Sequence, residues 1–208
     1  MATMTAGEDY VCDSYYQVRI ADAKGDYALR LAHCGAPRDF IRWAADLDVD
    51  DAWQTCVRPD WLIWHIAVLA AKPESPERRR IVSLLLRCVE PVLRYANEQD
   101  KTHWQNAINA ARSWVNESLP WTDVIAHIHD IPAVTDDADS AMSAAIVMVR
   151  PDPIVRTCSR TVALVANTAV ARAWLALRHN NDPLANSLTD IIRAEYPAPP
   201  ELPAVKEN

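Results

Sequence analysis

The stretch AWQTCVRPDWLIW, between Ala52 and Trp64, decides the fold class of this chain. It holds three of the eight tryptophans, and each indole is large, mostly apolar, and carries one donor that needs a partner when buried. An Arg-Pro-Asp turn divides the stretch, with the proline well placed at the first position of a helix. The spacing predicts a packing hub between two helices. Its residues are Trp53, Cys56, Arg58, Asp60, Trp61 and Trp64.

Within this hub we expect structural roles for the charged pair. Arg58 is suited to stack on an indole ring or to pair with a carboxylate. Asp60 is suited to cap the helix that it begins.

Glycine usage excludes several classes of catalytic loop. The chain has 208 residues and three glycines, Gly7, Gly25 and Gly35, so none occurs after position 35. Phosphate-binding loops, dinucleotide-binding turns and the nucleophile elbow all need glycine for close backbone approach or a strained turn. The chain has fourteen prolines, which start or end helices. Long glycine-free stretches favour helices joined by short connections.

Net charge and cysteine usage limit which partners and which cellular compartment are expected for this chain. The net charge is −7, whereas a nucleic-acid-binding surface needs a basic face. The longest uncharged apolar runs, 61–71 and 161–171, are too short to span a bilayer. The five cysteines are widely spaced without a C-x-x-C pair, and the first 18 residues lack the basic start of a secretory signal. We therefore expect a cytoplasmic protein with reduced thiols that binds neither nucleic acid nor membrane.

Hydrophobic periodicity predicts an all-α, single-domain bundle of about eight or nine helices. Residues 1–14 read as a flexible N-terminus, 15–197 as the helical domain, and 198–208 as a proline-rich tail. Segments 15–20 and 27–32 alternate apolar and polar residues around a glycine-containing turn. This pattern fits either a small β-hairpin or two short helical turns.

Local signals place the helix ends. Asp48 and Ser75 resemble N-caps, and so does the Thr-Asp-Asp run at 135–137. Pro91 interrupts a helix, and the two asparagines at 180–181 end the longest one, predicted over 154–179. That helix is apolar on most sides, which is typical of a central, buried element.

Two acidic clusters admit two interpretations. One comprises Asp46, Asp48, Asp50 and Asp51, and the other comprises Asp136, Asp137 and Asp139. Both lie at predicted helix starts, where carboxylates satisfy free N–H groups and the helix dipole. Alternatively they form an acidic face that steers a basic partner, and the same seven residues are then the partner-binding candidates. The three arginines at 78–80 are expected on a solvated helix face.

No residue pattern specifies a reaction. His127 and His129 stand two positions apart near Asp123, so on a helix they point in opposite directions and cannot share an ion. Cys34 follows His33 but has no identifiable base. His65 falls on an apolar stripe and is predicted to be a core histidine with a hydrogen bond. We expect no catalytic residue, no cofactor and no metal.

The chain resembles a family of all-α immunity proteins associated with bacterial polymorphic-toxin loci and phage genomes. Such proteins carry a tryptophan followed by a Cys-Pro-Arg-Ala-Asp-Trp-Leu-Leu-Trp stretch. The likeness spans residues 28–197, although the proline within the turn has moved. The matching residues are Trp53, the run from Cys56 to Trp64, the run 78–82, Glu90-Pro91, Trp114 after Ala110-Ala111, and the run 190–193 before Pro197.

This resemblance implies a non-catalytic protein that neutralises a toxin by protein–protein contact. An acidic binding face would suit a basic toxin. The alternative is a helical scaffold or phage accessory protein that acts through self-assembly, which would need a large exposed apolar patch. The two hypotheses differ in their partner and in their oligomeric state.

Overall fold

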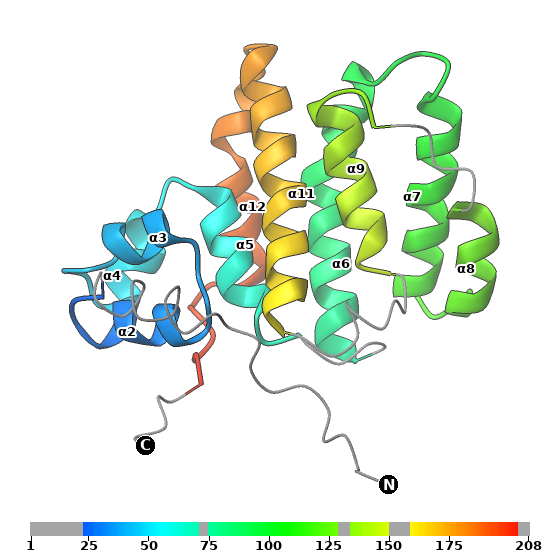
Figure 1. The fold of residues 1–208 in the computed structure, drawn as a ribbon. Helices are drawn as coiled ribbons and strands as arrows, with labels where there is room; N and C mark the ends of the chain where they lie inside the picture. Colours follow the sequence, from blue (N-terminus) through cyan, green and yellow to red (C-terminus); the bar gives the residue numbers. More distant parts are fainter. Residues whose placement is uncertain (1–22, 71–74, 129–133, 150–158, 204–208) are drawn as a thin grey trace, which may run out of the picture.

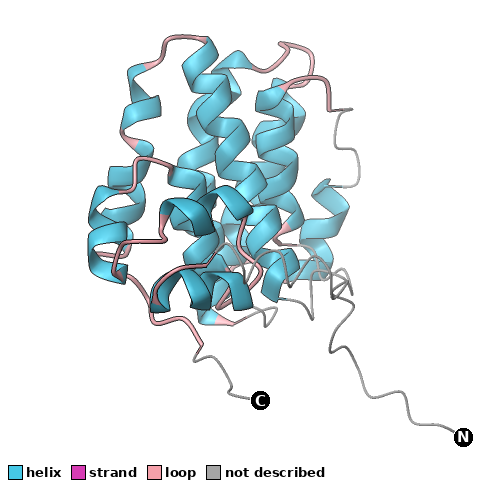
Figure 2. Cartoon of the chain, turned by 60° about the vertical axis from the view of Figure 1, so that its left-hand side comes forward, coloured by secondary structure: helices cyan, strands magenta, loops and turns pink. Residues whose placement is uncertain are grey.

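The structure is a computed structural model that describes residues 23–70, 75–128, 134–149 and 159–203. Within these ranges the chain forms ten α-helices and two short 3-10 helices, and no strand (Figure 2). This confirms the all-α prediction. None of these helices combines the length and the apolarity needed to cross a bilayer.

The helices follow one another with short connections. Their bounds are α2 Asp26–His33, α3 Arg38–Trp43, α4 Val49–Thr55, α5 Pro59–Ala67, α6 Pro76–Val89, η1 Glu90–Tyr95, α7 Lys101–Val115, α8 Trp121–Ile128, α9 Asp137–Val147, α11 Ser159–His179, η2 Pro183–Asn186 and α12 Leu188–Glu195. The small helices α2, α3 and α4 gather at one end of the molecule, and α8 lies beside α7 at the other (Figure 1).

Of the two alternatives for segments 15–20 and 27–32, the β-hairpin is wrong for the second segment, which is helical. Segment 27–32 lies inside α2, and segment 15–20 falls outside the described residues. Gly25 takes a positive φ of 79° directly before α2, and its carbonyl accepts the first helical hydrogen bond from Leu29. Buried positions then recur as Tyr27, Ala28, Leu31 and Ala32, which is the spacing of a helix face rather than of a strand.

The middle of the bundle is α11, which packs against α5 on one side and α9 on the other (Figure 1). Six of its alanines and valines have no exposed surface, and these are Val162, Ala163, Ala166, Ala169, Val170 and Ala173. Small side chains let neighbouring helices approach closely. One cluster of buried residues extends from Tyr27 to Leu202 and includes every long helix.

Helix starts and ends follow the local signals. The side chains of Asp48, Ser75 and Asp136 each accept a hydrogen bond from the backbone N–H three residues on. Pro91 ends α6, after which the chain tightens into the 3-10 helix η1. Asn181 takes the left-handed conformation with φ of 52° after α11.

The tryptophan-rich stretch joins α4 to α5. Trp53 and Trp64 are each 1% exposed, and Phe40 stacks on Trp61 at 5.2 Å between ring centroids. The Arg58 guanidinium pairs with both Asp60 oxygens at 2.8 and 2.7 Å and lies over the rings of Trp61 and Trp174. Asp60 does not cap α5 through its side chain, contrary to expectation: it is the second residue of the helix, Arg58 holds the N-cap position, and the Asp60 carboxylate pairs with Arg58.

Candidate functional site

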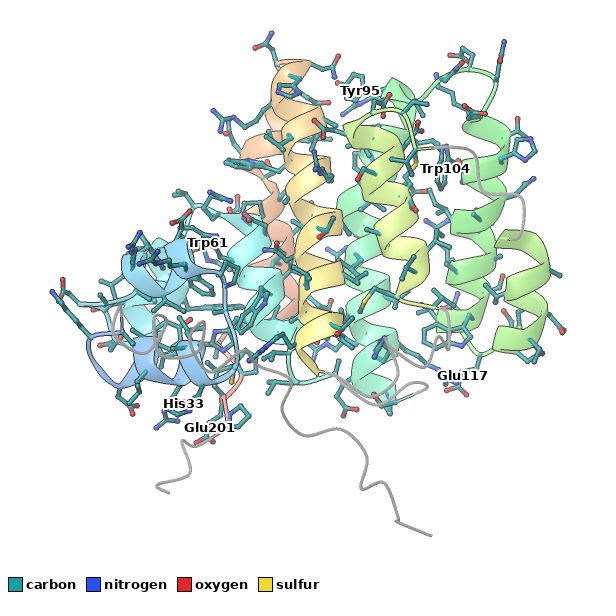
Figure 3. All side chains as sticks on the ribbon, viewed as in Figure 1. His33, Trp61, Tyr95, Trp104, Glu117 and Glu201 are labelled. Carbon is teal, nitrogen blue, oxygen red and sulfur yellow. The ribbon has the colours of Figure 1, made fainter. Side chains whose placement is uncertain are left out.

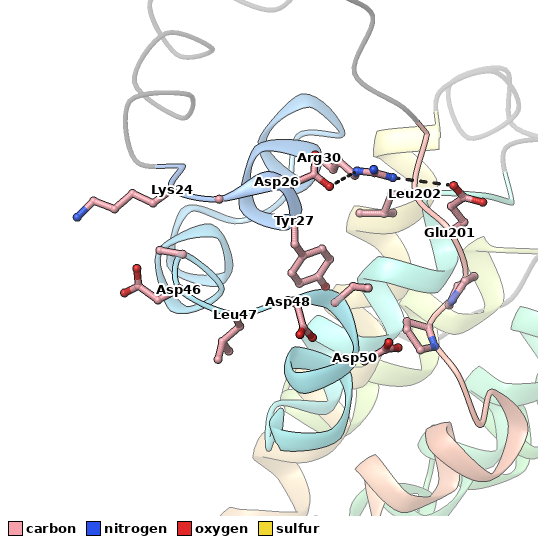
Figure 4. Close-up of a pocket in the computed structure, with 15 residues that line it drawn as sticks. Lys24, Asp26, Tyr27, Arg30, Asp46, Leu47, Asp48, Asp50, Glu201 and Leu202 are labelled. Carbon is pink, nitrogen blue, oxygen red and sulfur yellow. Dashed lines mark ion pairs between the residues drawn. The ribbon is translucent and has the colours of Figure 1, made fainter.

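A cleft of about 670 Å³ opens where the small N-terminal helices meet the end of the described chain (Figure 4). Its walls come from α2, from the loop that leads into α4, and from residues 199–202. The lining residues are Lys24, Gly25, Asp26, Tyr27, Arg30, Ala45, Asp46, Leu47, Asp48, Val49, Asp50, Pro199, Pro200, Glu201 and Leu202. Three of the seven candidate partner-binding carboxylates thus share one cavity.

The two sides of this cleft differ in how their charges are neutralised. On the α2 side, Arg30 pairs with Asp26 at 2.8 Å and approaches Glu201 at 4.0 Å. On the α4 side, Asp46 and Asp50 are exposed, and no ion pair links either carboxylate to a cation within the described residues. Among the described residues, the α4 side therefore carries the carboxylates of the cleft that have no ion pair.

Asp48 and Asp51 lie next to this wall with local roles. Asp48 caps α4 by accepting from the Asp51 N–H at 2.8 Å, while its side chain still faces the cleft. Asp51 is exposed but does not line the cavity. The helix-start interpretation is confirmed for Asp48. Partner binding stays a prediction for it, and the cap leaves some of its acceptor positions unused.

A buried histidine, His65, lies behind the wall of the cleft and contacts Tyr27. Tyr27 lines the cavity, and its hydroxyl lies 2.9 Å from Nδ1 of His65, which has no exposed surface. His65 Nε2 lies 2.7 Å from the carbonyl oxygen of Pro200. A carbonyl oxygen only accepts, so Nε2 carries the proton and Nδ1 accepts from Tyr27. The predicted core histidine is confirmed, with two partners.

Burial fixes the charge state of this pair. Desolvation lowers the pKa of His65 to about 4, although the hydrogen bond to Pro200 opposes the shift. Burial also raises the pKa of Tyr27. Both groups are therefore neutral at pH 7, and they contribute shape and hydrogen bonds rather than charge to the cleft.

The second acidic cluster does not form a comparable face. Asp139 has no exposed surface and accepts from Trp104 Nε1 at 2.8 Å and from the Thr135 hydroxyl at 2.7 Å. Asp137 pairs with Arg172 at 2.7 Å, and Asp136 caps α9. The expectation that Asp139 contacts a partner is corrected, because the end of the carboxylate is enclosed by donors from its own chain.

The other sequence candidates lie apart from the cleft. Cys34 is half-buried. Desolvation raises the pKa of its thiol, although the positive charge of Arg160 acts to lower it. His127 belongs to α8, but its side chain falls outside the described part of the structure, as does His129. Among the described residues, no group of three or more His, Cys, Asp or Glu side chains is arranged to hold a metal ion.

Two features were missed from sequence. Arg78, expected on a solvated face, is 2% exposed, and its guanidinium donates to the carbonyls of Ala70 and Met148 at 2.9 and 3.3 Å. The tail segment was expected only as a proline-rich extension, yet it forms one wall of the cleft. The apolar Leu202 between two prolines was the available signal, since it is 4% exposed in the structure.

Comparisons with protein-family models, with curated proteins and with solved structures find no match for this chain.

Proposed function

We propose that this protein is a non-catalytic binding protein that recognises a basic segment of a partner protein in the cleft between α2, α4 and residues 199–202. The observation that carries this proposal is the wall formed by Asp46, Asp48 and Asp50. Its carboxylates converge on a cavity and, for Asp46 and Asp50, find no cation among the described residues. The partner would be a toxin, as the resemblance to immunity proteins implies.

The shape and charge of the cleft suit a lysine or arginine side chain. Such a side chain has an apolar stem and a charged head. Tyr27, Leu47 and Val49 offer apolar surface for the stem. The carboxylates at the start of α4 offer acceptors for the head. With a net charge of −7, the whole protein also attracts a basic partner over longer range.

The test is co-expression with each toxin candidate encoded beside the gene, followed by binding measurements on any pair that restores growth. We expect one neighbour to be neutralised in a one-to-one complex whose association slows as salt is raised. Absence of both rescue and complex with every neighbouring product would refute the proposed function.

A pair of matched variants connects this binding to the cleft. Asp46→Asn with Asp50→Asn should slow association by about tenfold at low salt, because two unpaired charges leave the binding wall. Asp123→Asn with Asp190→Asn removes the same charge from exposed positions on α8 and α12 and should leave the rate within about twofold. Equal rates for the two double variants would show that the partner binds elsewhere.

The self-assembly alternative has less support. The large hydrophobic residues exposed on the described surface are Val57, Leu69, Val134 and Leu164, and each comes from a different segment of the chain. Single exposed apolar residues are normal on monomeric proteins. Light scattering at high protein concentration separates the two functions, since self-assembly requires an oligomer.

A further inference from the structure

The tail of the described chain covers a surface made of aromatic side chains, and we call this covered surface the groove. We name residues 197–203 the strap; it contains Pro197, Pro199, Pro200 and Pro203 and leaves α12 through Tyr196. Beneath it, the rings of Trp53 and Tyr27 flank the His65 ring at 5.5 and 5.7 Å. Figure 4 shows the strap running past α2 and α4 on its way to the C-terminus.

Ring N–H groups donate to one carbonyl oxygen of the strap and to one of the residue just before it. Trp53 Nε1 donates to the Tyr196 carbonyl at 3.2 Å, and His65 Nε2 donates to the Pro200 carbonyl at 2.7 Å. The Leu202 side chain adds an apolar anchor and is 4% exposed. The polar contacts of the strap with the groove floor thus use backbone carbonyls, while its apolar side chains fill the surface between them.

These contacts match the general chemistry by which proteins recognise proline-rich peptides. Proline lacks an N–H group and restricts φ, so a proline-rich segment is extended before it binds and offers more carbonyl acceptors than N–H donors. Aromatic-lined grooves recognise such segments at a small entropic cost. The floor made by Trp53, His65 and Tyr27 supplies the rings, and two of those side chains donate the hydrogen bonds.

The strap does not fill the groove. The cleft of about 670 Å³ lies along one side of it, and a second cavity of about 290 Å³, lined by residues including Ile66, Leu69 and Tyr196, lies along the other. Pro200 borders both cavities. Between the Pro200 carbonyl and the Leu202 anchor, the Glu201 side chain is 91% exposed, and its approach to Arg30 is 4.0 Å.

We propose that this groove is a binding site for an extended, proline-rich segment of a partner protein, and that the strap is a built-in occupant which such a segment displaces. This site goes beyond the proposed recognition of a basic segment, because its specificity comes from ring donors and apolar contacts. The strap also forms a wall of the acidic cleft, so its displacement widens that cleft.

The test uses a fluorescent peptide with the sequence of residues 196–203, titrated into full-length protein and followed by anisotropy. In the wild-type chain the tethered strap competes with the peptide. Leu202→Asp puts a charge in place of the buried anchor and frees the groove, so peptide affinity should rise by about tenfold or more. Val57→Asp adds the same charge at a position that is 78% exposed and should leave affinity at the wild-type value.

Two further arms identify the contacts. A peptide that carries Leu202→Asp itself should not bind, because it lacks the anchor. His65→Phe in the Leu202→Asp chain keeps an aromatic ring but removes the Nε2 donor, and should lower peptide affinity. Adding Asp46→Asn and Asp50→Asn should leave peptide affinity unreduced, which separates this site from the proposed cation-binding wall.

Circular dichroism establishes that each variant is folded before it is scored. If Leu202→Asp loses its helical signal, Leu202→Ala replaces it, with a smaller expected gain in affinity. The proposal is overturned if the folded strap variant binds the peptide no more tightly than the wild-type chain does.

Discussion

At the scale of single residues, carboxylates of the same type have different roles according to their surroundings. Asp46 is exposed beside the cleft, whereas Asp139 has no exposed surface and accepts hydrogen bonds at both oxygens. Trp104 donates to one Asp139 oxygen, and Thr135 donates to the other through its N–H and its hydroxyl. The first carboxylate is available to a partner, and the second stabilises the start of α9.

Asparagine substitution separates these roles. In Asp139→Asn the new amide group faces a donor whichever way it turns, so we expect a loss of about 2–3 kcal/mol in the free energy of unfolding. Asp46→Asn should change that energy by less than about 0.5 kcal/mol. Urea denaturation followed by circular dichroism measures both. Equal stability of the two variants would contradict the enclosed role assigned to Asp139.

At the scale of elements, the start of α6 is tied to its neighbours by a buried guanidinium. Arg78 opens the arginine run, and its donors reach the carbonyls of Ala70, just after α5, and of Met148, at the end of α9. Desolvation lowers the pKa of Arg78 to about 10, so the group stays charged at pH 7. The two arginines that follow point to more exposed partners, Glu117 and Glu195.

Replacing this side chain should loosen three helices at once. Arg78→Met keeps the apolar stem but leaves two buried carbonyls without these donors, and we expect a loss of about 2–4 kcal/mol. Arg87→Met breaks an exposed ion pair with Glu195 and should cost less than about 1 kcal/mol. Thermal unfolding of both variants provides the measurement. A larger loss for the Arg87 variant would show that the Arg78 contacts do not stabilise this junction.

At the scale of the whole molecule, His65 joins segments that are distant in sequence. Its partner Tyr27 lies 38 residues away on α2, and its partner Pro200 lies 135 residues away in the strap. The folded protein buries this ring in its neutral form, so protonation of the ring is less favourable in the folded chain than in the unfolded chain. Its pKa of about 4 lies below the ordinary value of 6.5.

Stability should therefore depend on pH in a defined direction. Between pH 6.5 and about 4 the unfolded chain binds a proton at His65 that the folded chain does not, so the contribution is complete above pH 6.5 and declines as pH falls toward 4. The total decline is on the order of 3 kcal/mol. The urea midpoint should depend less steeply on pH in His65→Phe than in His103→Gln, a control at an exposed site. Identical slopes would contradict the buried neutral state.

The sequence by itself determined the all-α class and several of the helix ends. Caps such as Asp48, Ser75 and Asp136 bond to the backbone three residues on, and asparagine after a helix acts through its own backbone angles. Such signals lie within one turn of chain, so they are readable without knowledge of the fold. The exception is the segment 27–32, where the alternation of apolar and polar residues also fitted a strand, although the segment is helical.

Only the tertiary structure decided which polar residues are enclosed and which line a cavity. Asp139 meets Trp104 across 35 positions, Arg78 meets Met148 across 70, and His65 meets Pro200 across 135. No local pattern encodes these pairings, because they depend on how helices and strap pack together. The acidic cleft and the groove beneath the strap exist for the same reason, since both form where the first helices meet the last residues of the described chain.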